Sequence, residues 1–349
     1  MKHAFLIAFF LFAAIGITGA RAQDAADLEG IKTYLLTNVA SLQANAARLE
    51  SGALDYYALA EAANFDYAAL WTSERVGTLH ALMRARDAWL TASPLYEQVE
   101  GVVAGVPSLS EFDVILDAGA SGADDPEGGV TFDLTLRDGR VLPRPGNLFG
   151  VLESTLWTTR SDYSSGVAAD LNLNSSADFG EQLPDAHVLL AAAETMENYT
   201  SDLVASAYAW QPTKEDAFTA LVVMVPTMSE YFAAWRDSRF VTGDASEQAE
   251  FVVISRLADI EDILGGLMVV YDGVSPVISA ADSAQDAQIR QGLTDLQAYV
   301  ADLYGQEQDG RTYSPEEADL FGTEAQNRAQ GIVGQITQVA ALLSIDLPE

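Results

Sequence analysis

Carboxylates at helical spacing are the residues of this sequence best suited to chemistry. Glu97 and Glu100 are three residues apart, which places them about 60° apart around a helix axis. Asp113 and Asp117 are four residues apart and likewise share a helix face, and Glu153 lies among apolar residues, where an acid is unexpected. Hard cations prefer such oxygen ligands, and helical bundles collect them from facing helices. The sequence therefore offers a carboxylate metal site.

The neighbours of the first pair favour a role as ligands. Trp89, Tyr96 and Val99 indicate that the helix carrying Glu97 and Glu100 is largely buried. Acidic side chains are rarely buried without a partner. These two acids are therefore the leading candidates.

Other acids keep structural alternatives. Asp113 and Asp117 could end a helix at the start of a glycine-rich loop. Glu153 could pair with an arginine such as Arg84 or Arg86. Both alternatives stay open from the sequence alone.

The second half of the chain supplies one more candidate ligand. One face of a predicted helix carries Ser255, Asp259 and Asp262. Of these, we include Asp259 among the candidate metal ligands. Glu194 and Glu197 repeat the three-residue spacing, but we interpret them as a solvated surface pair.

The histidines and cysteines exclude several catalytic mechanisms. Beyond residue 22 only His80 and His187 are present, and the chain has no cysteine. An HExxH zinc site and a thiolate site therefore cannot be built. No GxSxG elbow, Walker-type loop or GxGxxG motif occurs. Oxygen ligands remain.

Charge excludes further classes. The net charge is −33, and loss of Lys2 and Arg21 with a leader would change it to −35. Nucleic acid is excluded as a partner, because binding it requires a basic surface. Anionic membranes are disfavoured for the same reason, whereas cations and basic partners fit.

The N-terminus is typical of a secretory signal peptide over residues 1–22. Lys2 and His3 precede an apolar run at residues 4–14, and Ala20-Arg21-Ala22 is a small-x-small cleavage site. A membrane anchor would need about 20 apolar residues, and Arg21 interrupts the run. No later stretch reads as a membrane span, so we expect a periplasmic or secreted protein.

Helical periodicity predicts an all-α fold. Apolar residues recur at three- and four-residue steps in most of the chain, and the predicted helices are 28–49, 70–103 with a kink or boundary at Pro94, 108–116, 148–157, 187–210, 215–235, 247–270, 286–303 and one within 315–343. Residues 117–147 read as a glycine-rich loop with a small hairpin at 130–142, and 158–183 reads as loop. We expect two antiparallel bundles, an N-terminal one at 23–165 and a C-terminal one at 166–349.

Several segments resemble one protein family in their order along the chain. RARDAWL at 84–90, YEQVE at 96–100 and GNLFGVLE at 146–153 resemble motifs of imelysin-like and EfeO/EfeM proteins. The segments 229–240 and 255–259 resemble their second-half helices. The tail at 317–329 is similar to the branch of algal iron-assimilating periplasmic proteins.

The resemblance implies two four-helix bundles, a periplasmic location, a role in iron acquisition and a metal site where the bundles face each other. The histidine of the family's GxHxxE segment falls on Gly150 here, which argues against a peptidase and against a histidine ligand. An all-oxygen site then has six candidate ligands: Glu97, Glu100, Asp113, Asp117, Glu153 and Asp259. Iron, ferric or ferrous, is the expected ion, with calcium or another hard cation as an alternative.

Two functions of different classes remain open. The first is an iron-binding protein that acts with an iron permease or a surface protein. The second is a metal-free adaptor in which the paired acids are structural. Peptidase activity is a distant third.

Overall fold

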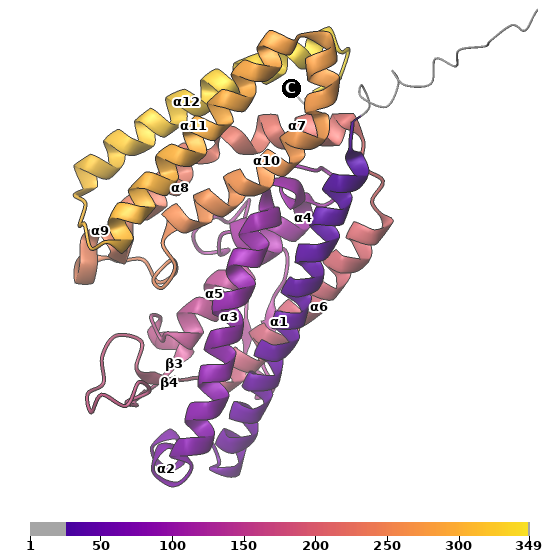
Figure 1. Cartoon of the computed structure of the whole chain (residues 1–349). Coiled ribbons are helices and arrows are strands. Elements are labelled where there is room, and N and C mark those ends of the chain that lie inside the picture. The colour runs from indigo at the N-terminus through magenta and orange to yellow at the C-terminus, as the bar shows by residue number, and fades with distance from the viewer. Residues whose placement is uncertain (1–25, 348–349) are drawn as a thin grey trace, which may run out of the picture.

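The computed structural model describes residues 26–347, and the predicted leader at 1–22 lies outside them. Long helices make up most of the described chain, and the strands are short (Figure 1). The predicted all-α fold is confirmed. The count of two four-helix bundles and their division at residue 165 stay predictions.

The first group of helices surrounds α1 (Leu28–Ala62). Helix α3 (Arg75–Val103) and helix α6 (Ala186–Ala209) both pack along it, so α6 lies with the N-terminal helices although it follows residue 165. Helix α5 (Leu148–Leu156) packs on α3 and α6, and the short α2 (Tyr67–Ser73) connects α1 to α3. The three- and four-residue steps of the sequence predict an apolar stripe on this helix, and most of it is buried: Ile31, Leu35, Val39, Leu42 and Leu49, with Leu28 at the N-terminal end only partly buried.

The second group contains α7 (Lys214–Met224), α8 (Met228–Asp237), α10 (Arg256–Ala281), α11 (Ser283–Gln308) and α12 (Pro315–Leu342). Helices α10, α11 and α12 follow one another side by side, and α8 packs on α12 (Figure 1). The short α9 (Arg239–Thr242) leads from α8 into the loop before α10.

Three predicted helix limits in this second group were wrong. The helix expected to end at residue 270 continues to Ala281. The helix expected over 215–235 is interrupted by a tight turn, Val225–Thr227, because Pro226 cannot continue the α-helical hydrogen bonding. The helix expected from Glu247 begins only at Arg256. The Ser255 side chain accepts a hydrogen bond from the backbone N–H of Leu257 and so caps the helix. Residues 246–255 are therefore a loop.

Pro94 neither ends nor divides α3, which runs through it to Val103. The helix is buried against neighbours on several sides, and this packing offsets the lost backbone hydrogen bond. Glu97 and Glu100 thus lie on a continuous helix.

The two groups meet where α10 crosses α3. A Cβ at Gly266 would lie 2.1 Å from the carbonyl oxygen of Gln98, and a Cβ at Gly101 would lie 2.7 Å from Cδ2 of Leu267. Only glycine allows the helices to approach this closely. The crossing lies at the level of Glu97 and Glu100 on α3. It therefore fixes the position of α10 relative to these two acids.

The strands form two small antiparallel pairs. β1 (Leu134–Thr135) pairs with β2 (Val141–Leu142), as the predicted hairpin requires. β3 (Ser164–Ala168) pairs with β4 (Gln182–Pro184), where the sequence had predicted only loop. The serines and the glycine of β3 do not give the alternating apolar pattern that predicts a strand. The pairing is also irregular, because the register shifts between its two ends.

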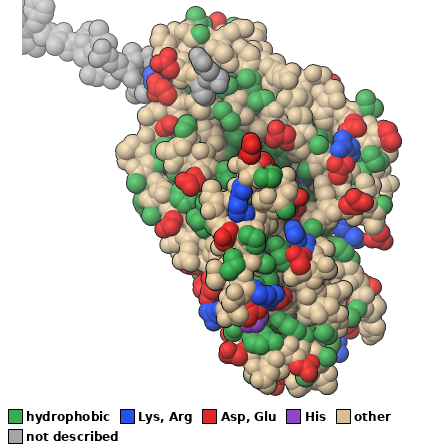
Figure 2. Space-filling model, turned by 180° about the vertical axis from the view of Figure 1, so that it is seen from behind, with side chains coloured by type: hydrophobic (Ala, Val, Ile, Leu, Met, Phe, Trp, Pro, Cys, Tyr) green, Lys and Arg blue, Asp and Glu red, His purple; other side chains and the backbone are tan. Residues whose placement is uncertain are grey.

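Two stretches of the described chain, Lys214–Asp237 and Arg256–Ala281, are long and apolar enough to cross a membrane, but more than half of each apolar window is buried in the protein. They therefore read as core segments. Figure 2 shows acidic side chains spread over one face of the molecule, with basic side chains among them.

Candidate metal centre

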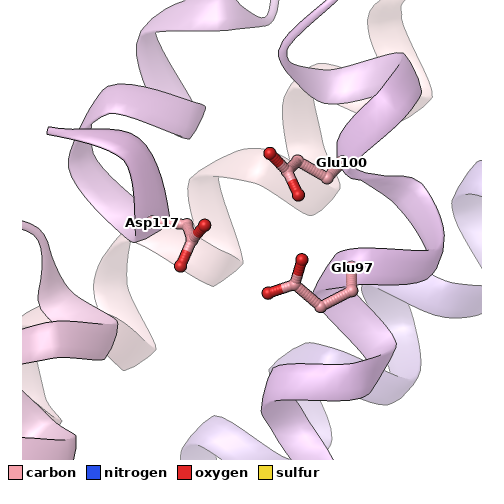
Figure 3. Close-up of side chains that lie close together, drawn as sticks. All are labelled: Glu97, Glu100 and Asp117. Atoms are coloured by element: carbon pink, nitrogen blue, oxygen red, sulfur yellow. The ribbon is translucent and has the colours of Figure 1, made fainter. Parts of the chain in front are cut away.

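Helix α3 buries both acids of its three-residue pair. The exposed fraction is 1% for Glu97 and 2% for Glu100. The two side chains point away from solvent toward the segment that contains Asp117 (Figure 3). Burial of two adjacent carboxylates is costly unless a cation or protons compensate them, so this pair is not an ordinary surface pair.

The opposite wall comes from α4 (Ser110–Asp113) and the π-helical turn that continues it, Val114–Ala118. The turn carries Asp117 toward α3, and one carboxylate oxygen from each of Glu97, Glu100 and Asp117 lies within 4.8 Å of the others. π-Helical turns are rare in proteins, and those that occur often lie at functional sites. We call these three residues the acidic triad.

Two further candidates lie beside the triad. Asp113 accepts a hydrogen bond of 2.7 Å from the hydroxyl of Tyr96. Asp259, in the first turn of α10, accepts one of 2.9 Å from Nη1 of Arg256. Both are buried, and both have one partner that holds the carboxylate in place.

Arg256 is the buried cation of this region. Its Nη1 is 3.8 Å from Oε1 of Glu97, and its Nη2 is 3.6 Å from Oδ2 of Asp117. The guanidinium lies 5.0 Å from the ring centre of Tyr231 and 3.7 Å from that of Phe251. One positive charge faces several carboxylates, so Arg256 compensates them only in part.

Arg256, Tyr96 and Tyr231 were not predicted as site residues. The ion pair of Arg256 with Asp259 could have been read from their spacing, since residues three apart on a helix are neighbours. Nothing in the sequence indicates that Tyr231 lies at the site. Its hydroxyl donates a hydrogen bond to Oε1 of Glu100. That contact joins α8 to α3 across the two groups of helices.

Two carboxylate oxygens of the triad have no hydrogen-bond partner among the described residues. They are Oε2 of Glu97 and Oε2 of Glu100. A buried acceptor without a partner costs about 1–3 kcal/mol, and such atoms require an explanation. A cation at the triad would supply the missing partner, so the residues present fit a hard metal ion.

Burial and mutual repulsion raise the pKa values of these acids. Burial, with the charges of Asp259 and Asp117 next, raises the pKa of Glu97 well above its usual value. Burial, together with Asp113 and Asp117, raises the pKa of Glu100 to about 8. Burial also raises the pKa of Asp113 to about 7, against the hydrogen bond from Tyr96. The cluster therefore holds protons that a metal ion would displace.

The structure places Glu153 differently from the other five candidates. Its carboxylate accepts the backbone N–H groups of Phe251, Val252 and Val253 at 2.6, 3.0 and 3.1 Å. Burial raises the pKa of Glu153 to about 8, and the three backbone donors act in the opposite direction. Both oxygens are thus engaged in holding a loop.

The arginines considered as partners of Glu153 lie elsewhere. Arg84 pairs with Asp55, and Arg86 donates to the backbone carbonyl oxygens of Leu156 and Gly180. The alternative of an ion pair between Glu153 and either arginine is therefore wrong.

A cavity of about 370 Å³ gives access to the cluster. It is lined by Glu100, Asp113, Asp117, Tyr231 and Arg256, among others. The structure thus brings together Glu97, Glu100 and Asp117, places Asp113 and Asp259 next to them, and engages Glu153 with the backbone of a loop.

Comparison with known proteins identifies the family. No curated protein matches the chain. The family model described as Imelysin, a peptidase-like family designated M75, matches residues 30–344, which is nearly the whole described chain. The matched range includes the triad, Arg256 and both groups of helices. The chain therefore belongs to the imelysin family.

Proposed function

We propose that this protein is exported and binds iron through the acidic triad in the service of iron acquisition. The observation that carries the proposal is the pair of buried, unpartnered oxygens on Glu97 and Glu100, which face Asp117. A cation held there would neutralise carboxylates that otherwise repel one another.

The ligand chemistry supports a hard ion. The triad and the neighbouring Asp113 and Asp259 offer only oxygen atoms, which suit ferric iron, calcium and similar cations better than soft metals. His80 is exposed on α3, and His187 stacks on Phe65 with ring centres 4.3 Å apart. Neither histidine belongs to the cluster, which supports an all-oxygen site.

The proposal includes the absence of peptidase activity and a location outside the cytoplasm. Gly150 stands where the resemblance expects a histidine, so this chain lacks that side chain for an activated water. The leader-like residues 1–22 support export. Mass spectrometry of the secreted form should find an N-terminus within a few residues of Gln23; recovery of intact Met1 from membranes would contradict this.

The test measures metal binding and stability together. Protein purified without chelator is analysed for metal, and the Glu97→Gln, Glu100→Gln double variant is titrated with Fe²⁺ under anaerobic conditions. If these acids are ligands, affinity should fall by orders of magnitude, because the number of ligand charges largely sets the affinity of oxygen sites. The matched control is Glu194→Gln, Glu197→Gln, the same spacing on α6, which should bind as the wild type does.

Stability separates this proposal from a metal-free adaptor. The metal-free double variant should be as stable as the wild type or more stable, because glutamine is always neutral, whereas Glu97 and Glu100 avoid mutual repulsion only by binding protons. Iron should raise the melting temperature of the wild type and not that of the variant. Unchanged iron stoichiometry and affinity in the variant would reject the site, and a loss of stability without a change in binding would favour the adaptor.

A further inference from the structure

Gly150 leaves a space that another side chain fills. An ideal Cβ at this position of α5 would lie only 1.8 Å from Oε2 of Glu250. Real Cβ atoms do not approach an oxygen so closely, so any other residue would displace this carboxylate. The carboxylate of Glu250 therefore fills the space that a side chain at position 150 would take, although the two residues are far apart in sequence.

Glu250 belongs to a segment that the protein holds firmly, residues 249–253, which we call the strap. Glu153 accepts three consecutive backbone N–H groups of the strap, and Thr159 donates its hydroxyl to the carbonyl oxygen of Ala249. Phe251 has a φ of 56°, a left-handed conformation that costs free energy in a non-glycine residue. Such a conformation persists because the hydrogen bonds to Glu153 define it.

The fixed strap directs two side chains to the site. The ring of Phe251 covers the guanidinium of Arg256, and the carboxylate of Glu250 is placed over Gly150. Glu153 therefore acts as a positioning residue for the strap.

Glu250 forms part of the boundary between two cavities. One, of about 250 Å³, is lined by Ser121, Asp124, Arg160 and Tyr163 with Glu250. The other is the 370 Å³ cavity that contains Glu100, Asp113 and Asp117, and Glu250 lines it as well. A carboxylate shared by both cavities can contact an ion in either one.

We infer that Glu250 is a further metal-binding carboxylate of this site. The strap carries it into the space that Gly150 leaves free of a side chain. There it binds a hydrated hard cation between the 250 Å³ cavity and the triad. This inference rests on the proposed function. It shares with that function the unpartnered Oε2 of Glu100, a side chain 2% exposed that lines the same cavity as Glu250. Its own support is the place of the Glu250 carboxylate, against Gly150 and on the lining of both cavities.

The charges around Glu250 agree with this role. Glu250 and Asp117 line the same cavity. Burial raises the pKa of Glu250, and the charge of Asp117 raises it further. Arg256 and Arg160 act in the opposite direction, and Asp124 adds to the repulsion. With Glu250 itself, three acids and two arginines thus meet around this carboxylate, and the excess of negative charge favours a cation.

Two variants remove this carboxylate by different means. Glu250→Gln keeps the shape and removes the charge, and Gly150→Ala expels the carboxylate without altering it. Chelator-stripped proteins are titrated with Fe²⁺ under anaerobic conditions and, separately, with Ca²⁺. We expect each variant to lose about tenfold in affinity, the effect of one fewer ligand charge near the ion.

Glu247→Gln is the matched control, because this exposed acid precedes the strap and lies outside both cavities. It should bind as the wild type does. If Glu250→Gln stays within about threefold of the wild type, or if Glu247→Gln loses as much, the inference is wrong. Should Gly150→Ala fail to fold, Glu250→Gln alone decides.

The two levels of the hypothesis fail differently. A wild type that binds neither ion rejects the proposed metal site, and with it the role of Glu250. A wild type that binds tightly while Glu250→Gln binds equally well rejects the role of Glu250 alone and leaves the triad in place.

Discussion

The substitution Glu153→Gln should destabilise the metal-free protein, whereas the same change at Glu97 or Glu100 should not. Glu153 accepts three backbone N–H groups through its two oxygens. Glutamine keeps one carbonyl oxygen and brings an NH₂ group that faces N–H donors. At least one donor is therefore left buried without an acceptor.

The magnitude follows from these contacts. At pH 9, above its pKa of about 8, the Glu153 carboxyl is ionised, and hydrogen bonds to a charged group contribute about 1.5–3 kcal/mol each. If the glutamine carbonyl keeps one or two of the three and a buried donor loses its partner, the free energy of unfolding should fall by about 3–5 kcal/mol. At about 2 °C per kcal/mol for a chain of this size, the melting temperature should fall by about 6–10 °C.

Urea unfolding of metal-free protein at pH 9 in the presence of a chelator measures this loss, with the exposed Glu61→Gln as control. Limited proteolysis should cut the variant first within the strap. A variant as stable as the wild type to within about 0.5 kcal/mol, combined with a lost metal ion, would show that Glu153 is a ligand and that its positioning role is wrong.

Three further predictions follow from the site and the helix crossing. Raised carboxyl pKa values of about 8 for Glu100 and about 7 for Asp113 mean that the folded protein holds protons that the unfolded chain releases. Stability of the metal-free protein should therefore fall as pH rises from about 4 to about 8, and melting scans that show a rise would contradict this. Arg256→Met should cost about 3–5 kcal/mol in urea unfolding of the metal-free protein, and Ca²⁺ should restore more stability to it than to the wild type. Gly266→Ala should cost about 3 kcal/mol by the same measurement, because its Cβ meets the backbone oxygen of Gln98; a neutral effect would show that α10 can move.

The fold could be predicted where one helix face carries the signal. The stripe of α1 and the capping of α12 by Ser314 and Glu317 are local patterns, and both are present. The β3–β4 pair was not predicted, because its strands are short and its register is irregular. The start of α10 at Arg256 has a local cap, Ser255, but the residues before it are held as a strap by Glu153, which is distant in sequence.

The candidate site was predictable only in part for the same reason. Spacing on one helix indicates that Glu97 and Glu100 act together, and their apolar neighbours indicate burial. Spacing cannot show that Glu153 meets the backbone of residues 251–253, nor that Tyr231 reaches Glu100. Both contacts arise only when segments about 100 residues apart or more pack together.

The close crossing of α3 and α10 bears on which ions such a site can accept. Since no side chain separates the helices at Gly266 and Gln98, the backbones touch there, and a slide of one helix along the other would drive a side chain into the contact. The positions from which Glu97 and Asp259 extend are therefore fixed by main-chain atoms. The helical side of the site therefore cannot move to suit a larger ion, and any adjustment must come from the turn that carries Asp117. Discrimination among cations of equal charge should then depend on ionic radius more than it does in a calcium site built wholly from a loop.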